Sequence, residues 1–387
     1  MTTIINGSSP SVTFSDNTTQ TTAGLPLTGG TVTGNVTATG NVTTAGLIIG
    51  TTALGAGNAT RFKNRIINGD MRISQRNGSS SATIGAAVTY TLDRWYGYGQ
   101  QASKFTIQQN AGSVTPPVGF INYLGATSLS AYSVLTGDEF DIAQPIEGLN
   151  VADLGWGTAD AKTVTLSFWV RSSLTGTFGG ALNNYNSSRS YPFSYTISSA
   201  NTWTQINLTV AGDTSGTWLT TNGIGLLVNF SLGAGATKSG TVNTWASANY
   251  TQPTGSVSVV GTSGATFYIT GVQLEVGSIA TGFEYVDYTT QLQMCQRYYE
   301  LVAYLDLQGY VQAGKQVYVN TSFVPKRTSP TIAAASTSNA DNATNFASNV
   351  FLYNTDNQHM VVQLVGNNGG LNYCRLTCNN FSYSAEL

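Results

Sequence analysis

The stretch Thr163-Val-Thr-Leu-Ser-Phe-Trp-Val170 decides the fold class of this chain. Its apolar residues alternate with polar ones along most of its length. In an extended strand this alternation places Val164, Leu166 and Phe168 on one face, and Val170 continues that face. We therefore expect a strand whose apolar face packs against a second layer of structure.

Comparable patterns recur on both sides of this stretch. Further strands are expected at 191–197, 202–210, 224–230 and 265–275. The first of these follows a loop at 186–190 that is typical of a hairpin tip, and 224–230 is apolar enough to be covered on both faces. Trp169 and Trp203 fall in strand patterns and are expected in the core. Many short strands separated by turn signals predict an all-β chain with a β-sandwich of the jelly-roll type.

The composition excludes several classes of function. The 387 residues include 16 Lys and Arg and 18 Asp and Glu, so only 9% are charged, against about 25% in an ordinary globular protein. A net charge of −2 gives no electrostatic reason to expect a nucleic-acid partner. No run of about 18 apolar residues is present, so no membrane insertion is expected. The first ten residues also lack the pattern of a secretory signal.

The cysteines do not suggest a disulfide framework, because Cys295, Cys374 and Cys378 are odd in number and lie near the C-terminus. If Cys374 and Cys378 share one strand, four steps of about 3.3 Å separate their Cα atoms by about 13 Å, too far for a bridge. A zinc site needs more ligands, and His359 is the only histidine. We expect reduced thiols, no metal and no cofactor.

Composition divides the chain into three segments, 1–60, 61–286 and 287–387. The first carries a single charged residue, Asp16, and contains a six-residue repeat at 33–38 and 39–44. Each repeat contributes one branched apolar side chain. This narrow row of apolar side chains can be buried only if successive repeats stack on one another or if further copies of the chain cover it. The segment is expected to be an ordered β-rich stalk, and the alternative is a flexible Gly/Thr linker.

The second segment contains all six tryptophans and the strand patterns described above. The third begins with the best helix candidate, in which Thr289 or Thr290 is expected to cap and Leu292, Cys295 and Tyr299 recur on one face. Strands are expected again at 317–324, 360–365 and within 371–383. One short helix followed by a small β domain is the expectation for 287–387.

Two long motifs that bracket the second segment resemble a domain of bacteriophage tail fibre proteins. The first is Arg61-Phe-Lys-Asn-Arg-Ile-Ile-Asn-Gly-Asp-Met-Arg-Ile-Ser-Gln-Arg76, followed by Tyr90-Thr-Leu-Asp-Arg-Trp95. The second is Gly271-Val-Gln-Leu-Glu-Val-Gly-Ser-Ile-Ala-Thr-Gly-Phe-Glu284, followed by Cys295-Gln-Arg-Tyr-Tyr299. Leu25-Pro-Leu-Thr-Gly-Gly-Thr-Val-Thr-Gly34 is similar to the shaft repeats of such fibres, and Phe323-Val-Pro-Lys-Arg-Thr-Ser-Pro-Thr331 to a segment of their C-terminal domain.

The resemblance implies a jelly-roll domain similar to carbohydrate-binding modules, a role in host adsorption and a homotrimer. It also implies attachment to other tail or baseplate proteins of the virion through residues 1–60. A protein of this kind is made in the host cytoplasm and ends in the phage tail. Residues 287–387 would then form a small C-terminal β domain, which is expected at the distal end.

Glycan recognition needs aromatic faces for the C–H surfaces of sugars and amides or hydroxyls for their OH groups, and Tyr and Trp suit such wet surfaces. The hairpin 183–189 and two loop tryptophans combine these groups. The candidate ligand-binding residues are Asn183, Tyr185, Asn186, Arg189, Trp218 and Trp245.

An acidic run, Asp138-Glu-Phe-Asp141, could supply carboxylates for calcium binding or for hydrolysis of a glycosidic bond. Because Asp138 and Glu139 are adjacent, a strand would point them to opposite faces, and a solvated turn is the preferred interpretation. His359 has no nucleophile elbow nearby, so no catalytic site is expected.

Basic residues cluster at the start of the second segment. They are Arg61, Lys63, Arg65, Arg72 and Arg76. They are interpreted as residues of the stalk–head junction that pair with Asp70, Asp93 and Glu284, and the alternative is docking to an acidic virion surface or an anionic host polymer.

These observations favour a non-enzymatic phage tail fibre protein that binds a host surface polysaccharide through several equal sites. Two alternatives remain open. The first is a structural virion component, either a capsid decoration or a connector between fibre and baseplate. The second is a tailspike that depolymerises polysaccharide.

Overall fold

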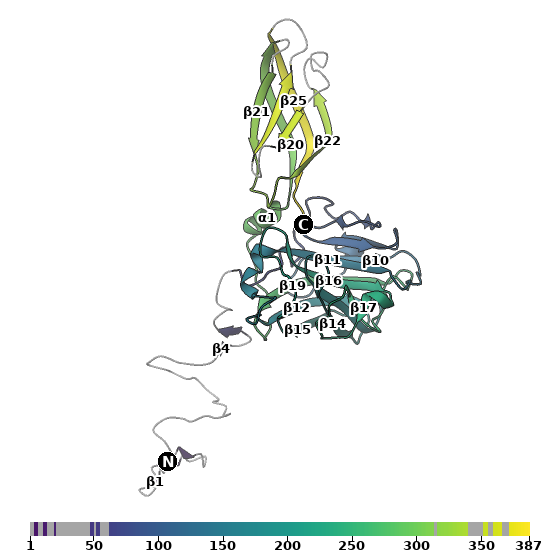
Figure 1. Cartoon of the computed structure of the whole chain (residues 1–387), viewed down its shortest axis with the longest axis vertical. Helices are drawn as coiled ribbons and strands as arrows, with labels where there is room; N and C mark the ends of the chain where they lie inside the picture. Colours follow the sequence, from purple (N-terminus) through teal and green to yellow (C-terminus); the bar gives the residue numbers. More distant parts are fainter. Residues whose placement is uncertain are drawn as a thin grey trace. The chain divides into compact units, whose positions relative to one another are not determined.

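The structure, a computed structural model, describes residues 62–312, 316–339, 351–354, 359–365 and 371–387, together with five short strands before residue 62. Side chains are described for 62–302, 322–333 and 382–387. The chain divides into two units, Met1–Gly46 and Leu47–Leu387 (Figure 1). The repeat at 33–44 lies outside the described residues, as does Arg61, so the stalk stays a prediction.

In the first unit, the described residues form an antiparallel sheet of β1 (Ile4–Asn6), β2 (Ser11–Thr13) and β3 (Thr19–Gln20). The second unit begins with an antiparallel pair of strands, β4 (Leu47–Ile49) and β5 (Thr52–Leu54).

Two six-stranded antiparallel sheets follow in the second unit and form a sandwich. The first sheet has the order β15 (Thr204–Val210), β12 (Val164–Ser172), β19 (Thr266–Val276), β10 (Leu124–Ser128), β9 (Phe105–Gln109) and β6 (Ala82–Thr83). The second has the order β14 (Ser190–Ile197), β13 (Gly176–Asn183), β16 (Ile224–Ala234), β11 (Glu139–Glu147), β8 (Tyr96–Gly99) and β7 (Thr89–Tyr90). This arrangement confirms the predicted all-β sandwich.

Short elements connect these strands. They are the 3₁₀ helices η1 (Ala111–Ser113), η2 (Gly148–Asn150), η3 (Ala152–Leu154) and η4 (Ala236–Lys238), and a parallel pair of β17 (Ser239–Gly240) and β18 (Gln252–Pro253).

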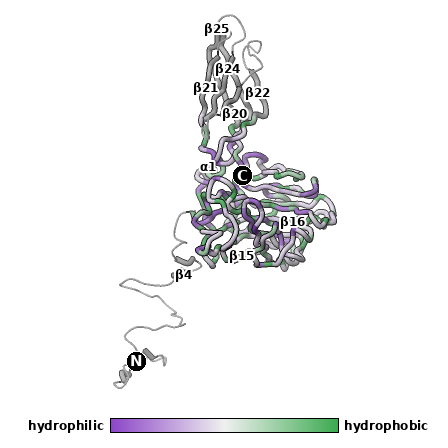
Figure 2. The backbone as a smooth tube through the Cα atoms, viewed as in Figure 1, coloured by the Kyte–Doolittle hydropathy of each residue, from purple (hydrophilic) through white to green (hydrophobic). Residues whose placement is uncertain are grey.

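The core lies between the two sheets and is built by strand alternation. On β12, Val164, Leu166 and Phe168 are buried in one apolar cluster, to which β16 contributes Val228 and Phe230. Figure 2 shows hydrophobic and hydrophilic residues interleaved along the strands of the sandwich. The expected faces of these strands are therefore confirmed.

Two tryptophans depart from the prediction that they lie in the core. Trp169 is only half-buried, because it points away from the face that carries Phe168. Trp203 is also half-buried, and it packs against Tyr123 and Tyr268 in a separate small cluster. The strand pattern identified the strands correctly, but Trp169 lies on the outer face of β12 and Trp203 directly precedes β15.

The C-terminal part begins with α1 (Tyr288–Gln296). Its N-cap is Asp287, whose carboxylate accepts a hydrogen bond from the Thr290 backbone N–H at 3.0 Å. The prediction that Thr289 or Thr290 caps the helix was therefore wrong by two or three residues. An aspartate caps a helix as well as a threonine does, and Asp287 precedes both threonines. Tyr299 lies beyond the end of the helix.

Two three-stranded sheets complete the chain. One has the order β20 (Tyr299–Gln312), β25 (Leu371–Ser384), β22 (Thr331–Asn339), and the other β21 (Gln316–Ser322), β24 (His359–Val365), β23 (Phe351–Asn354). The strands expected in this segment are present. Cys374 and Cys378 share β25, as the argument against a bridge assumed.

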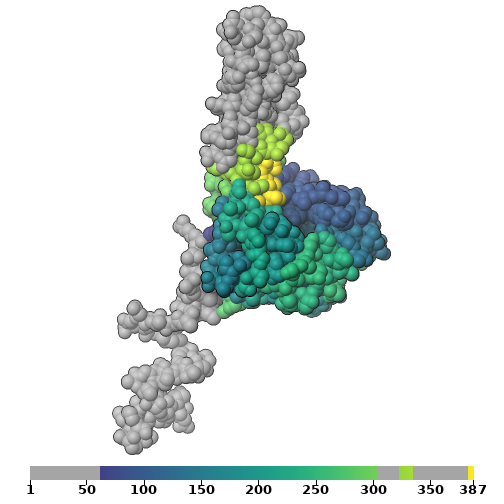
Figure 3. All heavy atoms as spheres, viewed as in Figure 1, coloured from purple at the N-terminus to yellow at the C-terminus, as the bar shows by residue number. Residues whose placement is uncertain are grey.

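The last residues of the chain contact the sandwich (Figure 3). The carboxylate of Glu386 forms ion pairs with Arg94, which is 1% exposed, and with Arg76 at 3.0 Å. The Tyr90 hydroxyl donates a hydrogen bond to the Leu387 carbonyl oxygen at 2.8 Å. Buried charges therefore join the C-terminus to the sandwich.

Candidate binding cleft

A cleft of about 190 Å³ lies on the outward face of the second sheet. Three neighbouring strands, β8, β11 and β16, form its floor, and the hairpin between β13 and β14 and the loop before β18 border it. It is lined by Val88, Tyr96, Tyr98, Glu139, Asp141, Ser187, Leu227, Asn229, Asn249 and Thr251.

Strand alternation explains why Glu139 and Asp141 share this cleft. They are two residues apart on β11, so their side chains leave the same face, while Phe140 and Ile142 point into the core. Asp141 lies opposite Tyr98 on β8. A register shift between Phe140 and Asp141 interrupts the pairing with β16, and such irregularities often re-aim side chains at binding sites.

The two carboxylates differ in their surroundings. Glu139 forms an ion pair with Lys238, with its Oε2 atom 2.9 Å from the Lys238 Nζ atom. Asp141 is 4% exposed, and its Oδ1 atom has no hydrogen-bond partner among the described residues. Burial raises the pKa of Asp141 well above its usual value, and the charge of Glu139 raises it further.

Thr251 is the second group in the cleft whose hydrogen bonding is incomplete. It is also 4% exposed, and its Oγ1 atom lacks a partner in the described part of the chain. Other polar groups here are engaged, since the Asn229 amide donates to Asn183 Oδ1 at 2.7 Å and the Tyr98 hydroxyl to Gln100 Oε1 at 2.8 Å. Buried polar atoms are normally paired, so Asp141 and Thr251 are suited to meet a ligand.

The predicted hairpin borders this cleft, but its residues divide into two groups. Tyr185 and Asn186 are exposed at the tip, next to Ser187, which lines the cleft. Asn183 is completely buried, and its amide donates to the Tyr250 carbonyl oxygen at 3.1 Å. The prediction that Asn183 binds a ligand is thus corrected. Its side chain stabilises the sheet and has no exposed surface that a ligand could contact.

The other three predicted ligand-binding residues lie in one neighbourhood. Arg189 forms a bidentate ion pair with Asp213, with two distances of 2.7 Å, and also donates to Ser247. Trp218 and Trp245 pack edge to face, with ring centroids 5.5 Å apart. The structure therefore brings these three residues into one neighbourhood. Arg189 binds the loops that carry the two tryptophans, and the tryptophan rings pack against each other.

Trp156 completes this cluster and is itself buried. Its ring centroid lies 4.8 Å from that of Trp218 and 5.3 Å from that of Trp245. Trp156 and Trp218 also line an apolar cavity of about 190 Å³. The indole N–H groups of Trp218 and Trp245 donate to backbone carbonyls, so these groups are already used.

The described members of the basic cluster have internal partners. Lys63 donates to Thr281 and to the Gly282 carbonyl, and Arg65 pairs with Asp153 at 2.8 Å. Arg72 pairs with Asp70, as the junction interpretation expects. Arg76 contacts Glu386 and lies over the ring of Tyr299 at 3.6 Å. These contacts join the segment to the rest of the unit.

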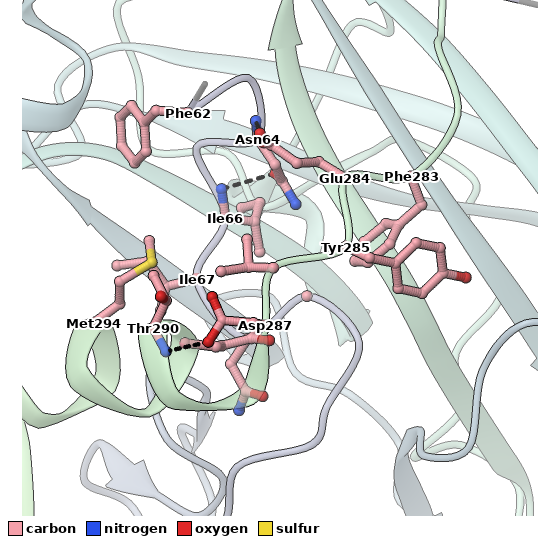
Figure 4. A pocket seen from close by; sticks show the side chains of 14 residues that line it. Phe62, Asn64, Ile66, Ile67, Phe283, Glu284, Tyr285, Asp287, Thr290 and Met294 are labelled. Carbon is pink, nitrogen blue, oxygen red and sulfur yellow. Dashed lines mark hydrogen bonds between the residues drawn. The ribbon is translucent and has the colours of Figure 1, made fainter. Parts of the chain in front are cut away.

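A larger cavity, about 500 Å³, lies where the described chain begins (Figure 4). Phe62, Ile67 and Met294 give it apolar walls. Its polar groups serve the fold, because the Asn64 side chain bonds the backbone of Ile66 and Leu274 and Asp287 caps α1. No unsatisfied side-chain polar atom is found among its described lining residues. For a polar ligand the smaller cleft is the better candidate.

The acidic run is split between two roles. Asp138 accepts hydrogen bonds from the Tyr132 hydroxyl at 2.7 Å and the Leu135 backbone N–H at 3.0 Å, so it stabilises its own loop. Glu139 and Asp141 belong to the cleft.

Among the described residues, no group of three His, Cys, Asp or Glu side chains is placed to hold a metal ion. The described helices include none with the length and apolar character of a membrane span.

Sequence reasoning missed most of the cleft. Tyr96, Tyr98, Asn229 and Thr251 were not among the candidates, and they come from three separate parts of the chain. The available signal was the spacing of two residues between Glu139 and Asp141, which places two carboxylates on one face of a strand.

No family model matches the chain, and no curated protein matches its sequence. Among solved structures it is similar to the enzymatically active domain of tailspike protein 4 of bacteriophage CBA120, with 12% identity and a TM-score of 0.28, covering 56% of this chain and 22% of that one. It is also similar to the family 11 carbohydrate-binding module of a Clostridium thermocellum cellulase (12%, TM-score 0.25, covering 51% and 96%). The baseplate tripod of bacteriophage Tuc2009 is a further neighbour (11%, TM-score 0.21, covering 68% and 84%).

Proposed function

We infer that the protein is a phage tail fibre protein that attaches the virion to a host surface glycan, and that the cleft on β8, β11 and β16 is its binding site. The observation that carries this proposal is the pair of buried, unpartnered polar atoms, Asp141 Oδ1 and Thr251 Oγ1, in a cleft walled by Tyr96 and Tyr98. Aromatic faces beside polar groups fit the two kinds of surface that a sugar presents.

The exposed hairpin tip extends this surface. Tyr185 is 42% exposed, and with Asn186 it adds an aromatic ring and an amide beside Ser187. Arg189 fixes the loops through Asp213 rather than binding the ligand itself. The proposal therefore retains Tyr185 and Asn186 as peripheral contacts and assigns Arg189, Trp218 and Trp245 to support.

A homotrimer belongs to this proposal, because the sequence resembles fibres that are trimeric. Three equal sites would convert weak single contacts into firm attachment through their high effective concentration. Residues 1–60 would attach the fibre to the virion. No bond is broken in this scheme.

Binding by variants of the full chain tests the proposal. Tyr98→Ala and Thr251→Val are expected to weaken binding to host cells and to purified surface polysaccharide by about tenfold or more, about 1.4 kcal/mol. Tyr288→Ala is the matched control, because Tyr288 is 56% exposed and does not line the cleft. Light scattering on the same samples gives the number of chains per particle.

Two results would contradict the proposal. If the wild-type chain neither binds host cells nor competes with intact phage for them, a structural role in the virion is the better explanation. If the chain releases new reducing ends from the polysaccharide, it is a depolymerase, and Asp141→Asn should then abolish the release.

A further inference from the structure

The charges of the cleft restrict which glycan it can accept. Glu139 and Asp141 face it, and Lys238, the cation near them among the described residues, is already paired with Glu139 at 2.9 Å. Arg189, at the neighbouring hairpin, is paired with Asp213. Among the described residues, Asp141 therefore forms no ion pair of its own, although the charge of Lys238 still acts on it.

A buried carboxylate that forms no ion pair favours a cationic ligand. Removing a carboxylate from water is costly unless a charge or strong hydrogen-bond donors compensate. The Oδ1 atom of Asp141 has none in the described part of the chain, and Thr251 Oγ1 beside the cleft adds a second free acceptor. A ligand carboxylate would instead meet the charge of Asp141, and the described lining offers it no cation outside an ion pair.

We propose that the cleft selects a glycan whose sugar carries a free ammonium group, and that this group donates hydrogen bonds to Asp141 and Thr251. This inference rests on the proposed function, because it assumes that the cleft binds sugars. The rings of Tyr96 and Tyr98 would contact the apolar face of the same sugar. Glycans rich in uronic acids are excluded by the charge of the site.

The pH dependence of binding follows from the groups that face Asp141, which are Glu139, Lys238, Tyr96 and Tyr98. Burial raises the pKa of Asp141, so in acid the carboxyl is neutral and attracts an ammonium group weakly. In alkali the sugar amine loses its proton. Affinity for an amino sugar is therefore expected to pass through a maximum, whereas affinity for a neutral sugar should not.

Matched oligosaccharides test the proposal on the full-length chain. Calorimetry would compare oligomers with a free amine, the same oligomers with an N-acetyl group, and oligogalacturonate, with and without a chelator. The amine is expected to bind at least about tenfold more tightly than the acetamide, since hydrogen bonds to charged groups are the stronger ones. Oligogalacturonate should bind least.

Asp141→Asn should abolish the preference for the amine, and Asp153→Asn, at an exposed ion pair outside the cleft, should retain it. The Asp141→Asn chain should fold at least as stably as the wild type at neutral pH, because ionising this buried carboxyl costs stability. If it does not fold, Thr251→Val, which should reduce the preference, takes its place.

Equal binding of amine and acetamide, tighter binding of oligogalacturonate, or a requirement for calcium would each overturn the inference. In those cases the chain still binds sugars, and the proposed function stands. If no oligosaccharide and no host polysaccharide binds, both the inference and the proposed function fail.

Discussion

Glu147 shows how a single buried charge is kept in this fold. It is 1% exposed, and its carboxylate accepts hydrogen bonds from Arg297 at 2.6 and 2.9 Å and from the Tyr298 hydroxyl at 2.7 Å. Burial alone would raise the pKa of Glu147, but the hydrogen bonds from Arg297 and Tyr298 outweigh burial, so its pKa lies below the usual value. The ionised form is therefore the stabilising one.

The lowered pKa of Glu147 predicts a loss of stability in acid. A carboxyl whose pKa is lower in the folded state contributes stability above its unfolded pKa, near 4.3, and loses it as the pH falls through the folded value. Glu147→Gln is expected to reduce the free energy of unfolding by about 2 kcal/mol at pH 7, because it removes the charge-assisted hydrogen bonds from Arg297, whose side chain is 34% exposed. Urea titrations at pH 7 and pH 3 measure this difference, which should shrink in acid.

Asp153→Asn is the control for this prediction. The Asp153–Arg65 pair is open to solvent on the Asp153 side, which is 47% exposed, so its loss should cost less than about 1 kcal/mol. A Glu147→Gln deficit that stays constant across the pH range would show that packing, not charge, explains the effect.

Strand β13 approaches its neighbours β14 and β16 more closely than most side chains would allow. A Cβ atom on Gly180 would lie 2.0 Å from the Asn229 carbonyl oxygen on β16 and 2.6 Å from the ring of Phe193 on β14. The absence of a side chain lets Phe193 fill the core beneath the strand. Position 180 therefore requires glycine, because no Cβ atom fits between the neighbouring strands.

Gly180→Ala is therefore expected to destabilise the sandwich by about 2 kcal/mol, the usual cost of forcing extra volume into a packed interior. Thermal unfolding measures the change as a lower Tm. Gly85→Ala is the matched control, since nothing lies within 4 Å of the Cβ position there. Equal effects of the two substitutions would argue against the close approach of β13, β14 and β16.

The strands could be predicted from the sequence because each carries its own alternating pattern, as β12 and β15 do. The cleft could not, because its groups meet only when β8, β11 and the loop before β18 come together in the fold. Asn183 shows the opposite error. An amide in a hairpin suggests an exposed ligand-binding group, but the pairing of Asn183 with Asn229 buries it.

Buried charges connect the chain's last residues to the sandwich. Arg94 is 1% exposed, and its guanidinium contacts Glu386, the Pro145 carbonyl oxygen and the ring of Tyr298. Glu386 also pairs with Arg76. The sandwich thus depends on a residue that follows it by about a hundred positions, so the segments 61–286 and 287–387 are expected to unfold together.

Tryptophan fluorescence can test this dependence, because all six tryptophans lie in 61–286 and report on the sandwich alone. Glu386→Gln leaves the charge of Arg94 buried without its partner and is expected to reduce the stability seen by tryptophan by about 3 kcal/mol. Asp153→Asn is the control, because the Asp153 side chain is 47% exposed and its ion pair with Arg65 should contribute less than about 1 kcal/mol. A tryptophan transition that Glu386→Gln leaves unmoved would mean that the sandwich folds independently of the C-terminus.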